Sequence, residues 1–306
     1  MPYRCLIFFC LFLISLNSFA NVRFTDQTAI QLINLNKENS LQQRVELHSA
    51  ALLGAPYQAG ALGEGLMGEY DQNPLYRFDH FDCETYVDTV MALALATNFL
   101  DFKKKINQIR YKQAQIGFFQ RNHFPSLDWI PNNKKNGNIR ELSYSIAGQK
   151  TRMATALINR RSWYQHLGID RIQIPYLSSL EKKIYLDELR KRGKVLTNSE
   201  KASIAYIPVA DVLNDSQLRK RIPTASLVFL VGHDNYLNYR IGTPMNVLHM
   251  GFAIWDKDQL YLRMASSRAG RVLDVRLQDY LKTYLALDTL KGISVWAIEE
   301  TSNQQS

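Results

Sequence analysis

Cys83 is the first residue that could do chemistry, in the stretch Phe81-Asp82-Cys83-Glu84-Thr85-Tyr86-Val87. Apolar residues recur at helical spacing after it, and Asp82 is a residue type that caps helix N-termini. We therefore predict Cys83 in the first turn of a helix, where the dipole and the free backbone N–H groups lower the pKa of a thiol. The same N–H groups can hold the oxyanion of a tetrahedral intermediate. This pattern predicts a cysteine nucleophile, and a structural cysteine on the apolar face is the alternative.

His249 is the candidate partner of this thiol, in the run Leu248-His249-Met250-Gly251-Phe252-Ala253-Ile254-Trp255. With the period of a strand, His249, Gly251 and Ala253 share one face, and the larger apolar residues share the other. Small neighbours leave room for a helix, so we expect the Cys83 helix to pack on this face and bring thiol and imidazole together. A core histidine is the alternative interpretation.

The elements that must position these residues change along the chain. Residues 24–54 and 83–100 have helical spacing, residues 60–68 are glycine-rich, and residues 101–200 are predicted to be mostly helical and irregular. Runs of β-branched and aromatic residues then occur at 204–209, 226–231, 248–255, 259–264, 271–275 and 293–298. Helices followed by antiparallel strands predict an α+β domain with one sheet.

The first twenty residues have the features of a signal peptide. Arg4 precedes an apolar run at 6–16, and small residues end the segment at Ala20. Because this run is too short to span a bilayer, we expect residues 1–20 to be removed and residues 21–306 to be exported, to the periplasm, without a stable membrane anchor. A retained anchor is the alternative. The other two cysteines lie in this segment, so Cys83 would have no partner for an internal disulfide.

Composition and charge restrict the partners. Hydrophobic residues at 46% and charged residues at 21% indicate a globular protein with a core. The formal charge of +9 is compatible with nucleic acid, an anionic membrane surface or an anionic polymer such as cell wall. The basic residues are scattered and form no basic and aromatic nucleic-acid motif. With export, this argues against nucleic acid as a partner.

Four segments follow one another in an informative order. They are Gly54-Ala55-Pro56-Tyr57, Asp82-Cys83, His249-Met250-Gly251-Phe252 and Ala265-Ser266-Ser267. In this order they resemble the NlpC-type cell-wall cysteine peptidase superfamily. The chain is more similar still to an exported branch, long designated a domain of unknown function, whose members act as N-acetylmuramoyl-L-alanine amidases. The further segments that match this branch are Ile109-Arg110-Tyr111, Arg121-Asn122-His123-Phe124, Asp128-Trp129-Ile130 and Leu277 to Leu281.

The resemblance spans roughly residues 45–300 and implies a fold. It implies a papain-like core in which N-terminal helices pack on a C-terminal antiparallel sheet. A single catalytic domain at 21–306 would carry a large, mainly helical insertion at about 101–200. In the catalytic centre, Cys83 matches the nucleophile, His249 the general base, and Tyr57 a tyrosine whose hydroxyl lies beside the oxyanion.

The resemblance also implies substrate-binding residues. Arg121, His123 and Trp129 match positions in the insertion of this branch, so we expect them at the substrate cleft, with Asp82 beside the nucleophile. An arginine can pair with a carboxylate and a tryptophan can stack on a sugar face, which suits that role. Ordinary surface and packing roles are the alternative.

One position departs from the pattern of the family. The third catalytic group is usually a histidine at the end of the next strand, and here that position is Met264. A thioether cannot accept the imidazole N–H strongly or fix its tautomer. Ser266, Arg263 or Asn246 could reach His249 in its place.

The sequence therefore predicts an exported cysteine amidase that hydrolyses the N-acetylmuramoyl-L-alanine bond of peptidoglycan fragments (muropeptides) without a cofactor. A γ-D-glutamyl endopeptidase would use the same residues. A catalytically silent muropeptide-binding protein is a second alternative because of Met264, and an exported cysteine transferase is a third. A zinc site joining Cys83 with His80 or His123 lacks a supporting ligand pattern, so we expect no metal.

Overall fold

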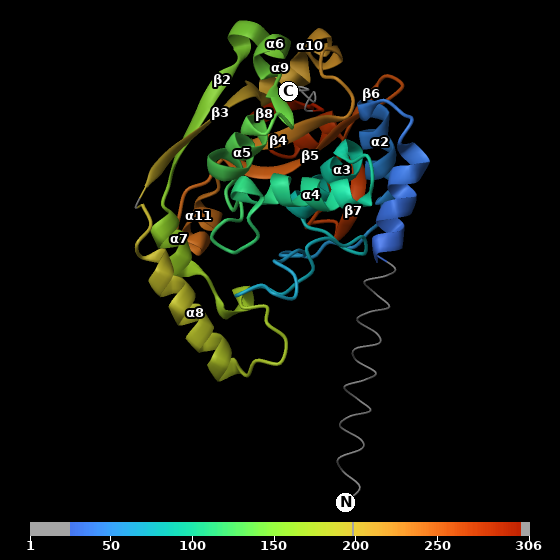
Figure 1. Ribbon diagram of the computed structural model, residues 1–306. Coiled ribbons are helices and arrows are strands. Elements are labelled where there is room, and N and C mark those ends of the chain that lie inside the picture. Colours follow the sequence, from blue (N-terminus) through green and yellow to red (C-terminus); the bar gives the residue numbers. More distant parts are fainter. Residues whose placement is uncertain (1–24, 198, 301–306) are drawn as a thin grey trace, which may run out of the picture.

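The computed structural model describes residues 25–300 except residue 198 (Figure 1). The predicted signal peptide lies outside this range. Helices surround one antiparallel sheet, so the fold is mixed α/β, as predicted. Of the helices described, none is both long and apolar enough to cross a membrane.

The sheet has eight strands among the described residues, in the order β2-β3-β8-β4-β5-β6-β7, and β1 also pairs with β8. Every pairing is antiparallel. All six strand predictions are confirmed, whereas β1 and β2 arise in residues 101–200, where we expected helices and irregular structure. The strands are β1 (Ile139–Glu141), β2 (Arg152–Ile158), β3 (Glu200–Pro208), β4 (Ser226–Gly232), β5 (Val247–Asp256), β6 (Gln259–Ser266), β7 (Arg271–Arg276) and β8 (Leu290–Ile298).

The N-terminal helices cover one face of the sheet (Figure 1). They are a helix at residues 25–36, α2 (Leu41–Ala51), α3 (Cys83–Leu95) and α4 (Phe99–Arg110). The two long helical predictions are each divided by a capping residue. Ser40 and Gln43 form a capping box that starts α2, and the side chain of Asn98 accepts the N–H of Asp101 at the start of α4.

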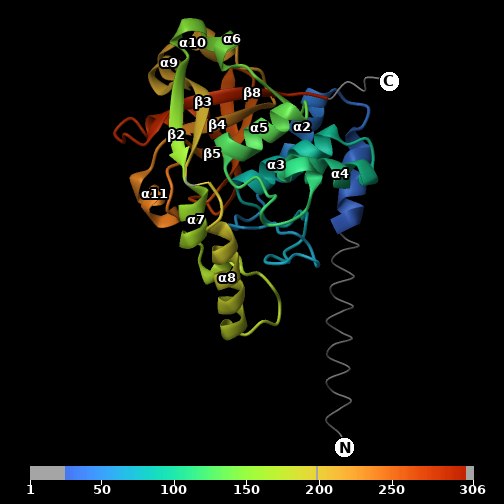
Figure 2. The same cartoon turned by 60° about the vertical axis from the view of Figure 1, so that its left-hand side comes forward.

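Other helices cover the opposite face or form a lobe beside the sheet. The opposite face is packed by α6 (Ser143–Ala147), α9 (Val209–Asn214), α10 (Ser216–Lys220) and α12 (Leu277–Lys282). An aromatic-rich lobe holds α7 (Arg160–His166) and α8 (Ser179–Gly193), and α8 projects away from the sheet in both views (Figures 1 and 2). The remaining helices are α5 (Ile130–Lys135), α11 (Asn235–Ile241), η1 (Lys112–Ala114), η2 (Pro125–Trp129), η3 (Gly148–Lys150) and η4 (Ile169–Arg171).

Helix α3 packs on the face of β5 opposite to the one we expected. Its apolar residues share a core with Met250 and Phe252, and the rings of Tyr86 and Phe252 meet at 5.8 Å. Ala253 belongs to the other core, with Met264. Gly251 is small for a different reason than expected, because a Cβ there would lie 2.5 Å from the carbonyl oxygen of Arg263 on β6. The prediction used strand alternation correctly but assigned the helix to the wrong face.

Candidate active site

Cys83 is the first residue of α3, as predicted, and is half-buried. The carboxylate of Asp82 accepts the N–H of Thr85 at 2.8 Å, and the Thr85 hydroxyl accepts the N–H of Asp82 at 2.9 Å. This reciprocal capping box fixes where the helix starts. It therefore holds the cysteine at the helix N-terminus, next to backbone N–H groups.

The electrostatics of the thiol differ from the prediction. Burial, followed by the charges of Asp82 and Glu84, raises the pKa of Cys83 well above its usual range. Backbone N–H groups of Met250 and Glu84 bond to the sulfur and act in the opposite direction. The resting group at neutral pH is accordingly a thiol, which needs a base to become a nucleophile.

His249 lies on β5 opposite Leu230 and is one residue before Met250, whose N–H contacts the sulfur. Its Nε2 is 3.0 Å from Sδ of Met264. Because a thioether has no proton to give, Nε2 is the donor, and Nδ1 carries the lone pair of the neutral ring. Burial lowers the pKa of His249 to about 4, although the charge of Asp82 opposes this shift. No hydrogen bond joins this imidazole to Cys83 among the residues described.

The other residues considered as third group are engaged elsewhere. Arg263 donates to the carboxylate of Asp274 at 2.7 Å, and the Ser266 hydroxyl accepts the N–H of Ala269 at 3.1 Å. Asn246 accepts the Ser126 hydroxyl at 2.5 Å and donates to two backbone carbonyls. Met264 is thus the side chain that contacts His249 at this ring nitrogen.

Tyr57 is held near the start of α3 by backbone pairing. Its N–H donates to the carbonyl of Gly270 at 2.8 Å, and it forms a parallel bridge with Phe81. Burial, together with the charges of Cys83 and Asp82, raises the pKa of Tyr57 to about 12. Its hydroxyl is therefore protonated at neutral pH and can donate a hydrogen bond.

Asp82 has a positioning role that the sequence analysis identified only in part. Besides capping α3, its Oδ2 accepts the N–H of Gly60 at 3.0 Å. Both carboxylate oxygens therefore accept backbone N–H groups, and they join the glycine-rich loop to the start of α3. We predicted that Asp82 contacts the substrate, whereas the structure shows that its carboxylate connects the glycine-rich loop to the start of α3.

Arg121 also differs from its predicted role. Its guanidinium pairs with Glu64 and lies 2.9 Å from the carboxylate of Asp71, and both acids are almost fully buried. Two internal carboxylates already balance its charge. Arg121 therefore connects the segment after η1 to the glycine-rich loop and the residues that follow it. Because its charge is already balanced, it is not free to pair with a substrate carboxylate.

His123 and Trp129 are packing residues in this structure. The His123 ring lies 4.6 Å from the Trp163 ring, and its Nε2 is 2.7 Å from the carbonyl of Phe118. Trp129 is 0% exposed and donates its Nε1–H to Asp88 at 2.8 Å. A fully buried ring has no face for a sugar, so the stacking prediction for Trp129 is wrong here.

Tyr280 is a residue that the sequence analysis did not single out and whose ionisation is coupled to Cys83. It lies on α12, and its hydroxyl is 3.1 Å from that of Tyr284. Burial and Tyr284 raise the pKa of Tyr280, and the charge of Cys83 contributes to the same shift. The available signal was its position inside Leu277 to Leu281, one of the segments that match the amidase branch.

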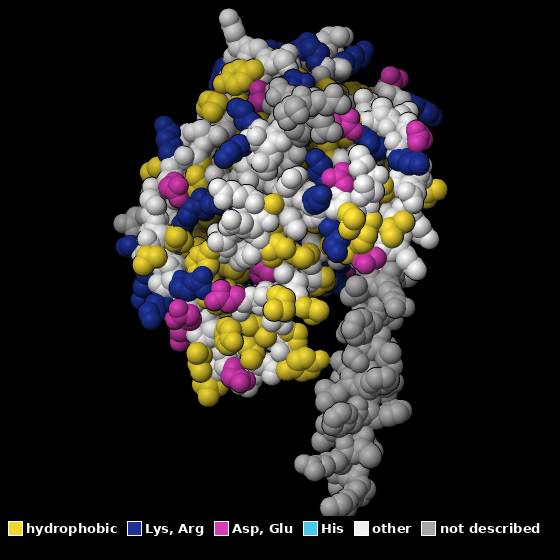
Figure 3. Space-filling model, viewed as in Figure 1, with side chains coloured by type: hydrophobic (Ala, Val, Ile, Leu, Met, Phe, Trp, Pro, Cys, Tyr) yellow, Lys and Arg dark blue, Asp and Glu magenta, His cyan; other side chains and the backbone are white. Residues whose placement is uncertain are grey.

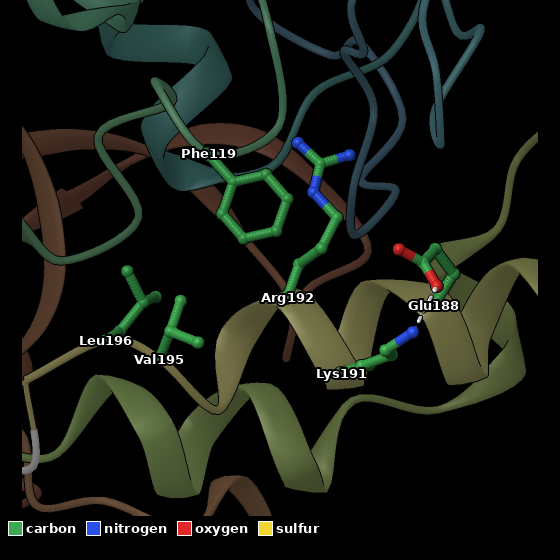
Figure 4. A pocket seen from close by; sticks show the side chains of 6 residues that line it. All are labelled: Phe119, Glu188, Lys191, Arg192, Val195 and Leu196. Atoms are coloured by element: carbon green, nitrogen blue, oxygen red, sulfur yellow. Dashed lines mark ion pairs between the residues drawn. The ribbon is translucent and has the colours of Figure 1, made fainter.

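A surface hollow of about 400 Å³ lies away from these residues (Figure 4). It lies between Phe119 and the end of α8, where the Arg192 guanidinium covers the Phe119 ring at 4.4 Å. Apolar side chains gather on the lower part of the face in Figure 3, where Figure 1 shows α8. In residues 25–300 without 198, no three His, Cys, Asp or Glu side chains gather as a metal ion would require.

Comparison with known proteins identifies the family of this chain. A family described as AmiA-like, N-acetylmuramoyl-L-alanine amidase-like, matches residues 47–287. The chain belongs to this family. The match includes the loop before Cys83, all of α3, and the strands that carry His249 and Met264. No curated protein matches the chain.

Solved structures share the fold of this AmiA-like protein. A Legionella pneumophila protein of the family DUF1460 is 34% identical, with a TM-score of 0.85 over 93% of this chain and 96% of that one. A Bacteroides fragilis protein named as a proposed xylanase is 25% identical, with a TM-score of 0.59 over 82% and 99%. An N-acetylmuramoyl-L-alanine amidase from Bacteroides uniformis is 23% identical, with a TM-score of 0.59 over 83% and 98%, and supports the fold alone.

Proposed function

We propose that this AmiA-like protein is an exported cysteine amidase of the periplasm, with an NlpC-type core. It would hydrolyse the amide between the lactyl group of muramic acid and L-alanine in muropeptides. One observation carries this assignment. Cys83 is the first residue of α3, and its sulfur accepts a hydrogen bond from the backbone N–H of Met250, the residue that follows His249. Membership of an amidase-like family supports an amide as the bond that is hydrolysed. The signal-peptide features of residues 1–20 support export.

In the first step, Nδ1 of His249 accepts the Cys83 proton as the sulfur attacks the lactyl carbonyl carbon. A neutral thiol and a neutral imidazole suit a proton transfer that accompanies the attack better than a preformed ion pair. The carbonyl oxygen becomes an oxyanion, which accepts hydrogen bonds from backbone N–H groups at the start of α3 and from the Tyr57 hydroxyl.

In the second step, the C–N bond breaks and the protonated His249 gives its proton to the L-alanine nitrogen. The acyl group remains on Cys83 as a thioester. A water molecule then attacks the thioester carbon while His249 accepts its proton, and that proton passes to the departing sulfur. The products are a muramic acid carboxylate and a free stem peptide, and these steps need no cofactor.

Mass spectrometry of defined muropeptides incubated with residues 21–306 tests the proposal, beside the same protein with Cys83→Ala. Release of a stem peptide that begins at L-alanine, lost in the variant, is the expected result. Cleavage inside the stem would replace the amidase with an endopeptidase, and products joined to an added amine would indicate a transferase. Activity retained by Cys83→Ala would contradict the nucleophile assignment.

A catalytically silent muropeptide-binding protein is the second candidate, favoured by the contact between His249 and Met264. This candidate predicts that the muropeptides stay intact with both the wild-type and the Cys83→Ala protein, and that both proteins bind them. Calorimetry with the same muropeptides separates this outcome from a protein that does not recognise them at all.

A further inference from the structure

A second surface hollow, of about 460 Å³, adjoins the one beside α8 and extends to the glycine-rich loop. The two hollows share Phe119 and Arg192 as lining residues, and Figure 4 shows these two side chains next to each other. Residues 64–69 and 116–120 line most of the second hollow. None of these residues takes part in the catalytic steps proposed above.

The glycine-rich loop connects this hollow to the start of α3. Gly60 donates its N–H to Asp82, the N-cap residue of α3, at 3.0 Å. The carbonyl of Gly63 accepts a hydrogen bond from Arg110 at 3.2 Å, and Nε of Arg110 lies 3.6 Å from the carboxylate of Asp88 on α3. The residue after Gly63 already lines the hollow and is at most about 14 Å from Gly60. A substrate that extends from the start of α3 along the loop can therefore reach the hollow.

The charged side chains that line the hollow already have partners within the protein. Glu64 pairs with Arg121, and Arg192 donates to the carboxylate of Glu69 at 2.6 Å. A charged group of a ligand would have to compete with these internal partners. The hollow therefore favours an uncharged ligand.

Gln120 supplies an uncharged polar group to the hollow. A Cβ on Gly117, another lining residue, would lie 2.6 Å from Oε1 of Gln120, so this amide lies against the lining of the hollow. The amide forms no hydrogen bond within residues 25–300 without 198, and it can both donate to and accept from a ligand. Arg192 forms its two hydrogen bonds through Nη1, which leaves Nη2 as a further donor in the described part of the chain.

Large apolar side chains are exposed around the same hollow. Leu66 is 82% exposed, Met67 is 94% exposed, and Ile116 is also exposed. Apolar groups that gather beside a few polar groups in a concave surface are typical of ligand-binding sites. These side chains can contact methyl and C–H groups of a ligand.

We propose that this hollow binds the N-acetylated sugar that is linked to the muramic acid of a longer muropeptide. The inference rests on the proposed function. Such a sugar is uncharged, and its acetamido group has a carbonyl, an N–H and a methyl group. Gln120 and Arg192 would bind the polar atoms of this group, and Met67 would contact the methyl group. The stem peptide carries charges, which the hollow does not favour. These residues determine which fragment binds, and the bond-breaking steps remain with Cys83 and His249.

Two muropeptides that differ by one sugar test the site. Both carry the same peptide, and one has an N-acetylated sugar on its muramic acid. We expect wild-type kcat/KM to be about tenfold higher for this disaccharide, mainly through KM, because one or two net hydrogen bonds are worth about that factor. Removal of the acetyl group from the added sugar should abolish the advantage. Gln120→Ala should remove most of it and leave turnover of the shorter substrate unchanged.

Met67→Ser is a second variant, and it should not disturb the fold because this side chain is exposed. It should reduce the preference for the disaccharide by a smaller factor than Gln120→Ala does. Gln149→Ala is the matched control, since Gln149 is an exposed glutamine of η3 whose side chain forms no hydrogen bond in the part of the chain described. It should keep the full preference. If neither Gln120→Ala nor Met67→Ser changes the preference, the sugar site is wrong.

Binding separates this inference from the proposed function. Calorimetry with the Cys83→Ala protein should show tighter binding of the disaccharide muropeptide, and Cys83→Ala combined with Gln120→Ala should lose this difference. Preferential binding without any turnover by the wild type would reject the amidase and keep the site. Turnover with equal affinity for the two muropeptides would keep the amidase and reject the site.

Discussion

The imidazole of His249 donates its Nε2–H to the thioether of Met264 across 3.0 Å. Sulfur is a weak acceptor without charge, so it holds the ring loosely and does little to stabilise the imidazolium formed during catalysis. The contact shows that Met264 faces His249, the general base of the proposed mechanism. In the proposed mechanism, Met264 occupies the position of a third catalytic group, but its thioether cannot stabilise the imidazolium as a histidine would.

Replacement of Met264 by histidine should maintain kcat or raise it by roughly tenfold. An imidazole at this position can accept the Nε2–H of His249 and support the positive charge that develops there. The measurement is kcat on a defined muropeptide, with circular dichroism to confirm the fold. Met264→Leu is the control, because it keeps the volume without an acceptor and should not raise kcat. A large loss in Met264→His with the fold intact would show that the new ring does not reach His249.

The reactivity of Cys83 should be low at neutral pH and should rise with pH. Burial and two adjacent carboxylates raise the pKa of this thiol, so the thiolate fraction should increase about tenfold per pH unit through the alkaline range. Iodoacetamide labelling of residues 21–306 at pH 6 to 10, followed by mass spectrometry, measures it at the single cysteine of that protein. A rate that is already constant below pH 8 would instead indicate a preformed thiolate.

Local sequence patterns predicted the strands and the start of α3 correctly. Asp82 and Thr85 are three residues apart, and the β-branched runs of the C-terminal strands are short-range signals. The face of β5 that receives α3 could not be obtained in this way. Alternation assigns residues to two faces, but which face meets a helix depends on contacts between distant segments.

The internal contacts of Arg121 and Trp129 could not be predicted for a related reason. Arg121 and Trp129 have the residue types that bind carboxylates and sugars, but the fold provides internal partners from Glu64, Asp71 and Asp88. These acids are 41 to 57 residues away in the sequence, so no local pattern reveals them. The start of α3 at Cys83 could be predicted because a helix start is a property of a single segment.

Arg121→Gln should destabilise the protein by about 3 kcal/mol, because it leaves Glu64 and Asp71 buried without their cation. The measurement is urea unfolding at pH 7. Arg171→Gln is the control, since Arg171 and its partner Asp170 are both exposed and such a pair contributes at most about 1 kcal/mol. An unchanged stability with an increased KM would restore the substrate-binding role predicted from the sequence.

His48→Leu should stabilise the protein, and more so at acidic pH. His48 is 0% exposed, and neither ring nitrogen has a hydrogen-bond partner among the described residues. Burial, with the charge of Arg44, lowers the pKa of His48 from 6.5 to about 4. Between these values the unfolded chain binds a proton that the folded protein does not, so stability falls as the pH falls from 6.5 towards 4.

A leucine at this position removes that proton linkage and the two unsatisfied nitrogens. At pH 5 the linkage costs the wild type about 2 kcal/mol, which the variant should regain. At pH 7 the histidine is neutral in both states, so the gain there should be smaller. Urea unfolding of both proteins at pH 5 and pH 7 measures the difference. The same difference at both pH values would mean that His48 does not titrate differently on folding, and that only its unpaired nitrogens matter.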